Sequence, residues 1–311
     1  MRVLLVEDEG KLAALVARGL TERGDVVDVV GTGDEALASA RGSHYDVILL
    51  DIRLPDQVAT PPAQVATPPV PSTSAAPETA LPQSSEPFEL DPTAFTSDVT
   101  NPWFPLEPGT RWTYRETTED GEVVSVVVSA TSATRKIANG VTARVVRDTV
   151  TLDGKVIEDT LDWYAQDSAG TVWYLGENTA EFEDGKVATR KGSFEAGVDG
   201  AQAGVIMPAT PEVGMTYRQE YYKGEAEDNG EVLALGQRAS VPAGVYDDAV
   251  QTADTTPLEP DVLEHKYYAQ GVGLVLTIDR EADGREELLT ITHVSDAEAR
   301  RAGTAQLGQP Y

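Results

Sequence analysis

Short apolar runs alternate with helically spaced apolar residues over the first 56 residues. Val3–Val6 is a short continuous apolar run, which predicts a strand that is buried on both faces. Val26–Val30 and Tyr45–Leu50 predict a second and a third strand. Between the first two, leucine and valine recur at helical spacing from Gly10 to Arg23, and Gly24 is placed to end that helix. Thr32 and Glu35 form a capping-box signature for a second helix that runs to Arg41. The pattern predicts a right-handed parallel α/β unit.

This periodicity stops at residue 57. Between Gln57 and Pro87 the chain holds eight of its 19 prolines, no aromatic residue and no Lys or Arg, and the sequence QVATPP occurs twice. Such a segment buries too little apolar surface to offset the entropy lost on ordering. We therefore expect residues 57–94 to form a disordered linker, rich in Pro, Ala, Ser and Thr and partly polyproline-like.

In residues 95–294, apolar and polar positions alternate with a period of two. Valine alternates with polar residues over Glu122–Val128, as in a half-buried strand. Four turn dipeptides separate such runs and predict hairpins: Asn139-Gly140, Asp153-Gly154, Asp184-Gly185 and Asp283-Gly284. Ser295 and Glu298 open a short helix in the last segment, 295–311. We predict a mainly antiparallel β domain followed by this helix and a tail.

Three blocks of sequence recur within the β domain at a nearly constant offset of 104 or 105 residues. The pairs are GTRWTY at 109–114 with GMTY at 214–217, NGV at 139–141 with AGV at 243–245, and WYAQ at 163–166 with YYAQ at 267–270. We infer an internal duplication, in which two copies of a strand–hairpin–strand unit share one sheet or face each other across a core.

Charge and composition argue against several kinds of chemistry. Acidic residues outnumber basic ones 52 to 24, and the net charge of -28 repels nucleic acid and anionic membrane surfaces. No run approaches the ~20 apolar residues that a membrane span needs. The absence of cysteine excludes disulfides, thiolate zinc sites and cysteine nucleophiles, and three histidines argue against a multi-histidine metal site.

The beginning of the chain does not have the pattern of an export signal. Only four apolar residues precede Glu7-Asp8-Glu9, whereas a secretion signal has an apolar run of roughly 7–15 residues. We therefore expect the chain as written to stay in the cytoplasm.

Three carboxylates follow the ends of the first and third predicted strands. Glu7 and Asp8 come directly after the first strand, and Asp51 comes after the third. Groups at the carboxyl ends of neighbouring parallel strands converge on one crevice. A hard ion such as Mg²⁺ accepts these oxygen ligands and neutralises an incoming phosphoryl group. The pattern alone leaves a second interpretation open, in which the carboxylates are solvated strand ends.

The segments MRVLLVEDE, GTGDEALASA and YDVILLDIRLPD resemble the first half of a response-regulator receiver domain, most closely that of winged-helix transcription regulators. The resemblance covers residues 1–56 and implies a flavodoxin-like fold. It further implies that Glu7, Asp8 and Asp51 hold Mg²⁺, and that Asp51 accepts phosphate from a histidine kinase.

The resemblance stops at Asp56. In the receiver family a fourth and a fifth strand supply a Ser or Thr and a Lys to the phosphoryl group; no later segment restores them, and no winged helix follows. The strand Val47–Leu50 then becomes a bare apolar edge, which should pair or aggregate. The remaining core is small for a domain that folds alone. We predict that Asp51 is phosphorylated poorly or not at all.

Three segments of the β domain resemble an uncharacterised family of bacterial exported proteins: NPWFPL at 101–106, DWYAQDSAGTVWYLGE at 162–177 and EYYKGEAED at 220–228. The resemblance covers most of residues 95–280 and implies no known activity. Members begin with a signal or lipoprotein segment and a Ser/Pro/Thr-rich spacer, which residues 57–94 resemble. We interpret the chain as a receiver fragment in the place of an export signal, joined by a gene rearrangement or a sequence-assembly error.

Few side chains of the β domain point to catalysis. One acidic run offers a carboxylate pair or a Ca²⁺ site, although a solvated face is the preferred interpretation: Glu220, Glu225, Glu227 and Asp228. His265 and His293 lie on separate predicted strands and are interpreted as ordinary strand residues. Eight aromatic residues offer a carbohydrate- or lipid-binding face, although stabilisation of the sheet is preferred: Trp103, Trp112, Trp163, Tyr164, Trp173, Tyr174, Tyr267 and Tyr268.

The sequence thus predicts an α+β multidomain chain, with a truncated flavodoxin-like fragment at 1–56, a linker at 57–94, a β domain of two similar halves at 95–294 and a helix and tail at 295–311. We do not expect an enzyme. The first functional hypothesis is a phosphorelay protein with an incomplete receiver, Mg²⁺ as cofactor and a histidine kinase as partner. The second is an exported-type β domain that binds a small ligand or an envelope partner, with an inert receiver fragment. The third, which has the least support, is a carboxylate-dependent hydrolase.

Overall fold

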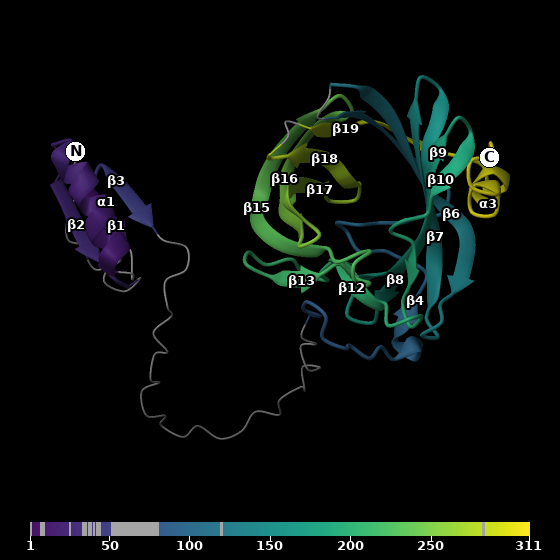
Figure 1. Ribbon diagram of the computed structural model, residues 1–311, viewed down its shortest axis with the longest axis horizontal. Helices are drawn as coiled ribbons and strands as arrows, with labels where there is room; N and C mark the ends of the chain where they lie inside the picture. Colours follow the sequence, from purple (N-terminus) through teal and green to yellow (C-terminus); the bar gives the residue numbers. More distant parts are fainter. Residues whose placement is uncertain are drawn as a thin grey trace. The chain divides into compact units, whose positions relative to one another are not determined.

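The computed structural model describes residues 2–6, 10–24, 26–32, 36, 39, 41, 45–50, 81–118, 121–281 and 284–311. The chain divides into two compact units, Met1–Ala76 and Pro77–Tyr311 (Figure 1). We describe each unit by itself.

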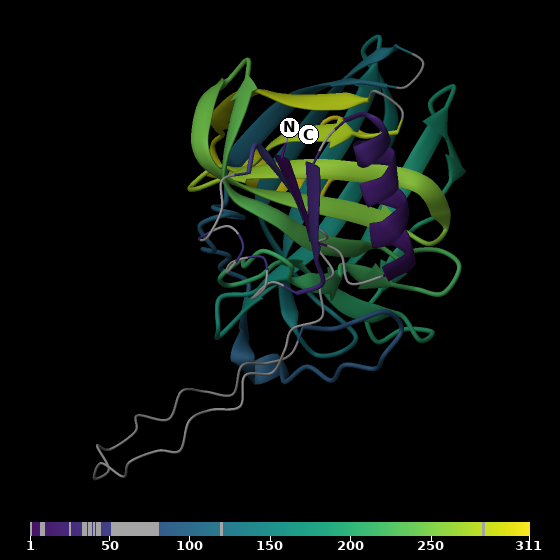
Figure 2. The same cartoon turned by 90° about the vertical axis from the view of Figure 1, so that its left-hand side faces the viewer.

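The N-terminal unit contains a three-stranded parallel sheet with strand order β2-β1-β3. Its elements are β1 (Arg2–Val6), α1 (Gly10–Glu22), β2 (Val26–Val30) and β3 (Val47–Leu50). Val3 to Val6 on the central strand are buried, as a continuous apolar run predicts. Helix α1 runs beside the strands, which Figure 2 shows from a second side. The predicted helix from Thr32 to Arg41 falls mostly outside the described residues.

Strand β3 lies at one edge of this sheet and pairs with β1. Its side chains remain partly exposed, with relative exposures of 37% for Val47, 51% for Ile48 and 38% for Leu49. The bare apolar edge that the sequence predicts is therefore present among the described residues of this unit. Such an edge is a template for pairing with another chain.

The second unit is a barrel-like antiparallel sheet that curves around an interior (Figure 1). Its sixteen described strands are β4 (Phe95–Thr96), β5 (Thr110–Thr117), β6 (Val123–Lys136), β7 (Thr142–Leu152), β8 (Lys155–Asp167), β9 (Val172–Glu183), β10 (Lys186–Thr189), β11 (Phe194–Glu195), β12 (Gln202–Met207), β13 (Thr216–Arg218), β14 (Glu220–Tyr221), β15 (Asn229–Val241), β16 (Gly244–Thr256), β17 (Glu259–Ala269), β18 (Gly273–Asp279) and β19 (Arg285–His293). The 3₁₀ turn η1 (Pro92–Ala94) precedes them and the helix α3 (Asp296–Ala302) follows.

The two halves that the sequence predicts follow one another in the order of the strands. The sheet runs β13-β15-β16-β17-β18-β19 and then β5-β6-β7-β8-β9-β12, which are two meanders of the same kind placed side by side. The repeated blocks occupy equivalent places, because GTRWTY and GMTY lie at the first strand of each half. WYAQ and YYAQ lie at the fourth strand of each half. The two halves therefore share one continuous sheet.

Two of the predicted hairpins show the backbone that their sequence demands. Asp153 and Gly154 have φ angles of 50° and 75°, and Asp184 and Gly185 have 50° and 72°. A two-residue turn of type I′ needs positive φ at both positions, which Asp tolerates and Gly adopts freely. These dipeptides therefore fix the register of β7 on β8 and of β9 on β10.

The ordered β domain begins earlier than the sequence predicts. Leu81, Phe88 and Leu90, which the sequence places in the linker, pack against its second hydrophobic cluster. The buried guanidinium of Arg218 donates hydrogen bonds of 2.8 Å to the carbonyls of Ser84 and Glu86. This segment has few hydrophobic residues. It is nevertheless packed against the domain, because the buried Arg218 guanidinium binds its backbone carbonyls. Residues 57–80 of the predicted linker lie outside the described residues.

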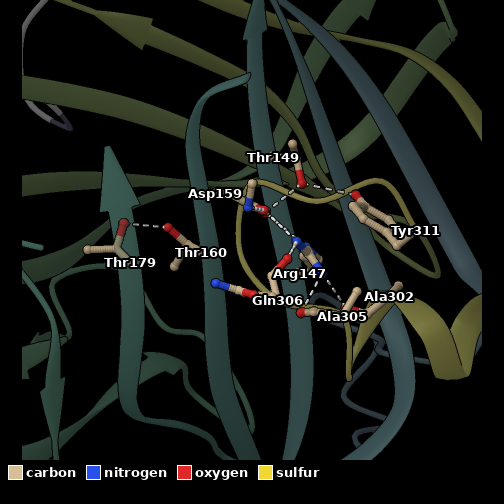
Figure 3. Close-up of polar contacts among 10 residues, drawn as sticks. Arg147, Thr149, Asp159, Thr160, Thr179, Ala302, Ala305, Gln306 and Tyr311 are labelled. Atoms are coloured by element: carbon tan, nitrogen blue, oxygen red, sulfur yellow. Dashed lines mark hydrogen bonds and ion pairs between the residues drawn. The ribbon is translucent and has the colours of Figure 1, made fainter. Parts of the chain in front are cut away.

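A buried ion pair fastens the C-terminal segment to the outer face of the sheet (Figure 3). Arg147 on β7 and Asp159 on β8 form two hydrogen bonds, and their side chains are 0% and 1% exposed. The same guanidinium donates to three tail carbonyls at 3.1–3.2 Å: those of Ala302, Ala305 and Gln306. The predicted capping box at Ser295 and Glu298 begins α3. This charge therefore anchors the end of α3 and the tail.

Candidate functional site

The three carboxylates of the predicted Mg²⁺ site, Glu7, Asp8 and Asp51, lie outside the described residues. The strands that precede them are placed as predicted. Strands β1 and β3 are parallel neighbours, and Val6 is the register partner of Leu50. The two strands therefore end beside each other at the same edge of the sheet.

The second unit contains a cavity of about 450 Å³. One part of its lining is aromatic and aliphatic, and includes Phe104, Leu106, Trp112, Tyr114, Tyr164 and Tyr268. Another part carries charge, from Glu116, Asp148, Asp162, Glu264, Lys266, Asp279, Arg285 and Glu286. The lining of this space thus combines apolar and acidic side chains.

The period of the strands explains how carboxyl groups come to lie inside. On β5, Trp112 and Tyr114 are buried, and Glu116 follows two residues later on the same face. The Trp112 indole donates to the Val272 carbonyl at 2.9 Å, and the Tyr114 hydroxyl donates to the Leu274 carbonyl at 2.9 Å. These bonds fix the inner face of β5 against β18 and against the loop that precedes β18.

The segment NPWFPL supplies one wall of the cavity. Its buried Asn101 donates hydrogen bonds to the carbonyls of Gly170 at 2.9 Å and Pro208 at 3.1 Å. The Asn101 side-chain oxygen accepts a bond of 2.9 Å from the backbone N–H of Trp103. This network holds the turn that brings Phe104 into the cavity lining. A motif with no known chemistry therefore has a structural role here.

Glu116 on β5 and Glu286 on β19 are direct cross-strand partners. Like charges in opposite positions destabilise a sheet. Burial, followed by the charge of Glu116, raises the pKa of Glu286 to about 7. Burial also raises the pKa of Glu116. A raised pKa on both carboxyls reduces the cost of placing two like charges together, because a carboxyl that keeps its proton carries no charge.

Asp148 on β7 is a diagonal neighbour of Asp162 on β8, since Asp148 pairs with Thr160. Burial raises the pKa of the Asp148 carboxyl well above its usual value, and the charge of Asp162 adds to this. The Oδ1 atom of Asp148 is buried and has no hydrogen-bond partner among the residues that the structure describes. Asp148 is also one of the residues that line the cavity. An unpaired oxygen at this position is costly for the free protein.

Asp162 and Glu177 on β9 are joined by the Tyr174 hydroxyl. The hydroxyl oxygen lies 2.7 Å from Asp162 Oδ1 and 2.8 Å from Glu177 Oε2. A phenol has one hydrogen to donate, so both bonds form only when one of the carboxyls is protonated. Burial raises the pKa of Asp162 to about 7 and that of Glu177 to about 8. Geometry and pKa values therefore agree that this group holds a proton near neutral pH.

The two basic residues of the lining already have carboxylate partners. Lys266 Nζ lies 2.7 Å from Asp254 Oδ2 and 3.0 Å from Glu264 Oε2. Burial alone would lower the pKa of Lys266, but these two charges raise it well above its usual value. Arg285 Nε lies 2.9 Å from a Glu287 oxygen. Both cations are therefore neutralised in place.

The acidic run proposed from the sequence is only partly brought together. Glu220 and Asp228 are largely buried, and their pKa values are raised, chiefly by burial. Glu225 is exposed, and Glu227 accepts a bond of 2.7 Å from the backbone N–H of Gly224. Within the described part of the chain, no three His, Asp or Glu side chains are arranged to hold a metal ion.

The histidines and aromatic residues singled out in the sequence lie in different parts of the β domain. His265 on β17 lies 3.0 Å from the Gln251 amide, and β18 separates it from His293 on β19. Trp163 and Trp173 belong to the second buried cluster, as the preferred structural interpretation expects. Three of the eight aromatics instead line the cavity: Trp112, Tyr164 and Tyr268.

Residues 3–58 match the family model of the response regulator receiver domain. Over 55 residues the chain is 51% identical to the transcriptional regulatory protein TcrA of Mycobacterium tuberculosis, covering 18% of this chain and 22% of that protein. Over 56 residues it is 46% identical to the transcriptional regulatory protein CusR of Escherichia coli, covering 18% and 25%. The chain thus spans a quarter or less of the length of these relatives. The predicted receiver fragment is confirmed.

The β domain is similar to two solved structures of low sequence identity. One is a protein with a YmcC-like fold from Bacteroides fragilis, assigned as exported, at 17% identity and a TM-score of 0.37; the match covers 61% of this chain and 98% of that one. The other is a beta-barrel-like protein of a domain of unknown function from Brucella abortus, at 13% identity and a TM-score of 0.32, with 60% and 98% covered.

None of the helices in the described ranges is long and apolar enough to cross a membrane. The cytoplasmic location expected from the sequence stays a prediction.

Proposed function

We propose that the β domain binds a small organic molecule in its interior cavity, and that the chain is a binding protein and not an enzyme. The cavity is the observation that carries this proposal. Ligand sites in proteins are concave, mainly apolar spaces of roughly 300–1,000 Å³ with a few placed polar groups. At about 450 Å³, with an aromatic wall and a set of buried carboxyls, this cavity has the size and composition of such a site.

The energetic cost of the lining supports the same proposal. A sheet that only needed a stable core would fill this space with apolar side chains, because unpaired buried carboxyls destabilise the fold. Asp148 and Glu286 instead lie inside with raised pKa values. Perturbed carboxyls in a cavity are typical of functional sites.

A neutral fluorescent dye tests whether the cavity takes up an apolar guest. We expect N-phenyl-1-naphthylamine to gain fluorescence and shift to the blue when added to the full chain. Val128→Phe places a ring in the cavity that Val128 lines, and should abolish the signal. Val123→Phe on the same strand is the matched control, because Val123 is 56% exposed. Equal signals from both variants, or none from the wild type, would contradict the proposal.

A second function is favoured by the receiver match and by the adjacent ends of β1 and β3. We propose that Asp51 is the phosphoacceptor position and that it holds Mg²⁺ together with Glu7 and Asp8, which are hard oxygen ligands that suit this ion. The ion would neutralise charge on the incoming phosphoryl group. Transfer from a histidine kinase is proposed to be weak, because the strands that complete the family's site are absent from the sequence.

Acetyl phosphate tests this second function directly. Incubation of the full chain with acetyl phosphate and Mg²⁺, followed by intact mass measurement, should give a substoichiometric phosphoryl adduct at most. Asp51→Asn should remove any adduct that forms. Stoichiometric labelling that depends on Asp51 would show a competent receiver.

A further inference from the structure

The cavity places aromatic faces beside carboxyl groups on the same strand. Asp162 and Tyr164 lie two residues apart on β8, and both line the cavity. The Phe104 ring lies 5.2 Å from the Tyr164 ring and 6.2 Å from the Tyr268 ring, centroid to centroid. Aromatic faces attract cations by their quadrupole, most strongly where water is excluded. The apolar wall is therefore itself suited to a positively charged guest.

The charged residues of the lining also favour a positively charged guest. Six carboxyl groups and two basic groups line the cavity. Both basic groups are already paired: Lys266 with Asp254 and Glu264, and Arg285 with Glu287. The carboxyls are thus in excess: a cationic guest would favour their ionised form, whereas an anionic guest would meet like charge wherever one of them is ionised.

Asp148 supplies an observation that is independent of this count. Its buried Oδ1 atom has no partner among the described residues, although the carboxyl lines the cavity. A buried polar atom is normally satisfied, and this oxygen is covered in the free protein, so a small shift of the Asp148 side chain on binding would let a guest donate the missing hydrogen bond. A protonated amine supplies both the donor and the opposite charge.

We propose that the ligand is a small organic cation, a protonated amine on an aromatic or aliphatic body, with its ammonium group at Asp148 and its body against Phe104, Tyr164 and Tyr268. This proposal rests on the proposed binding function of the cavity. The absence of a three-carboxylate metal arrangement among the described residues favours an organic cation over a metal ion.

Three probes of matched size separate charge from shape. Isothermal titration of the full chain at about pH 8, where primary amines remain protonated, would compare 2-phenylethylamine, 2-phenylethanol and 3-phenylpropanoate. We expect the amine to bind at least about tenfold more tightly than the alcohol, and the acid to bind most weakly. Asp148→Asn should reduce the amine affinity by about tenfold and leave the alcohol unchanged.

The control variant is Glu231→Gln, which removes one exposed carboxyl from β15 and should leave all three affinities unchanged. Circular dichroism of Asp148→Asn would establish that it is folded. Equal affinities for amine and alcohol, a preference for the acid, or no binding of the amine would overturn the cation assignment. Dye uptake that is blocked by Val128→Phe would still support the cavity as a binding site, so the two proposals fail separately.

Discussion

Asp162 on β8 and Glu177 on β9 face each other directly across a strand pair, with the Tyr174 hydroxyl within 2.8 Å of both carboxyls. This arrangement works only with a shared proton, since the phenol donates once. Glu286, which lies opposite Glu116, is a further interior carboxyl that holds a proton near neutral pH, because burial raises its pKa to about 7.

Stability should fall as the pH rises from about 5 to about 8. A carboxyl whose folded pKa is raised keeps its proton when the unfolded chain has lost it, so its contribution is complete below the unfolded pKa and is lost as pH rises through the folded one. For Glu286 the window runs from 4.5 to about 7, which corresponds to about 3 kcal/mol at most. Scanning calorimetry as a function of pH measures this.

The net charge of -28 also weakens the fold as the pH rises, so a variant must isolate the interior groups. Glu286→Gln should flatten the dependence of the melting temperature on pH, because Gln does not titrate. An unchanged slope in Glu286→Gln would contradict the raised pKa.

Removal of the shared hydroxyl should destabilise the sheet. Tyr174→Phe leaves Asp162 and Glu177 facing each other without the group that joins them, and should cost about 1–2 kcal/mol in urea unfolding. Tyr267→Phe is the matched control, because Tyr267 lies outside this network. Equal unfolding midpoints for Tyr174→Phe and wild type would show that the hydroxyl does not stabilise the sheet.

The ion pair under the C-terminal segment should be needed for the tail to stay attached. Asp159→Asn leaves the Arg147 charge buried without its partner, which costs about 3–5 kcal/mol. We expect amides of residues 303–311 to exchange hydrogen much faster than in wild type. Tyr311→Phe, which removes only the 3.0 Å contact with Thr149, should have a small effect. Protection of the tail that survives Asp159→Asn would contradict the anchor.

The exposed edge of β3 should drive self-association. Ile48→Lys introduces a charge on a strand whose apolar side chains face solvent, and charged edges resist pairing. Sedimentation velocity at rising concentration should show less association for this variant. Val213→Lys, at a residue of the β domain that is 62% exposed, is the control and should leave association unchanged. The same association in both variants would contradict a role for the edge.

Local sequence signals predicted the elements well. Val26–Val30 is a strand with the bounds that its apolar run predicts. The dipeptide Asp153-Gly154 forms its hairpin because the turn geometry is set by two residues alone. The Ser295 capping box begins α3 for the same reason. Each of these features depends on neighbours in the chain.

The interior carboxyls could not be assigned from such signals, because alternation shows that a strand has two faces but not which face is enclosed. A weak signal does exist: Glu116 is in phase with the inward-facing Trp112 and Tyr114. A carboxyl in phase with aromatic residues is unusual for a simple core. The sequence cannot, however, show that Glu286 arrives opposite Glu116, since that contact joins strands from different halves.

The long-range anchors were missed for a related reason. Arg218 holds residues 84 and 86 from more than 130 positions away, and Arg147 holds the tail from more than 150. A single arginine on a strand looks like a solvated charge in the sequence. Only the folded sheet shows that each one is buried against backbone carbonyls.

We expect carboxyls inside the sheet to hold protons near neutral pH. A ¹³C NMR titration of the side-chain carboxyl resonances, with Glu286 assigned by comparison with Glu286→Gln, measures this directly. The account predicts a midpoint of about 7 for Glu286. A midpoint close to the ordinary value of about 4.3 for glutamate would show an open, hydrated interior and contradict it.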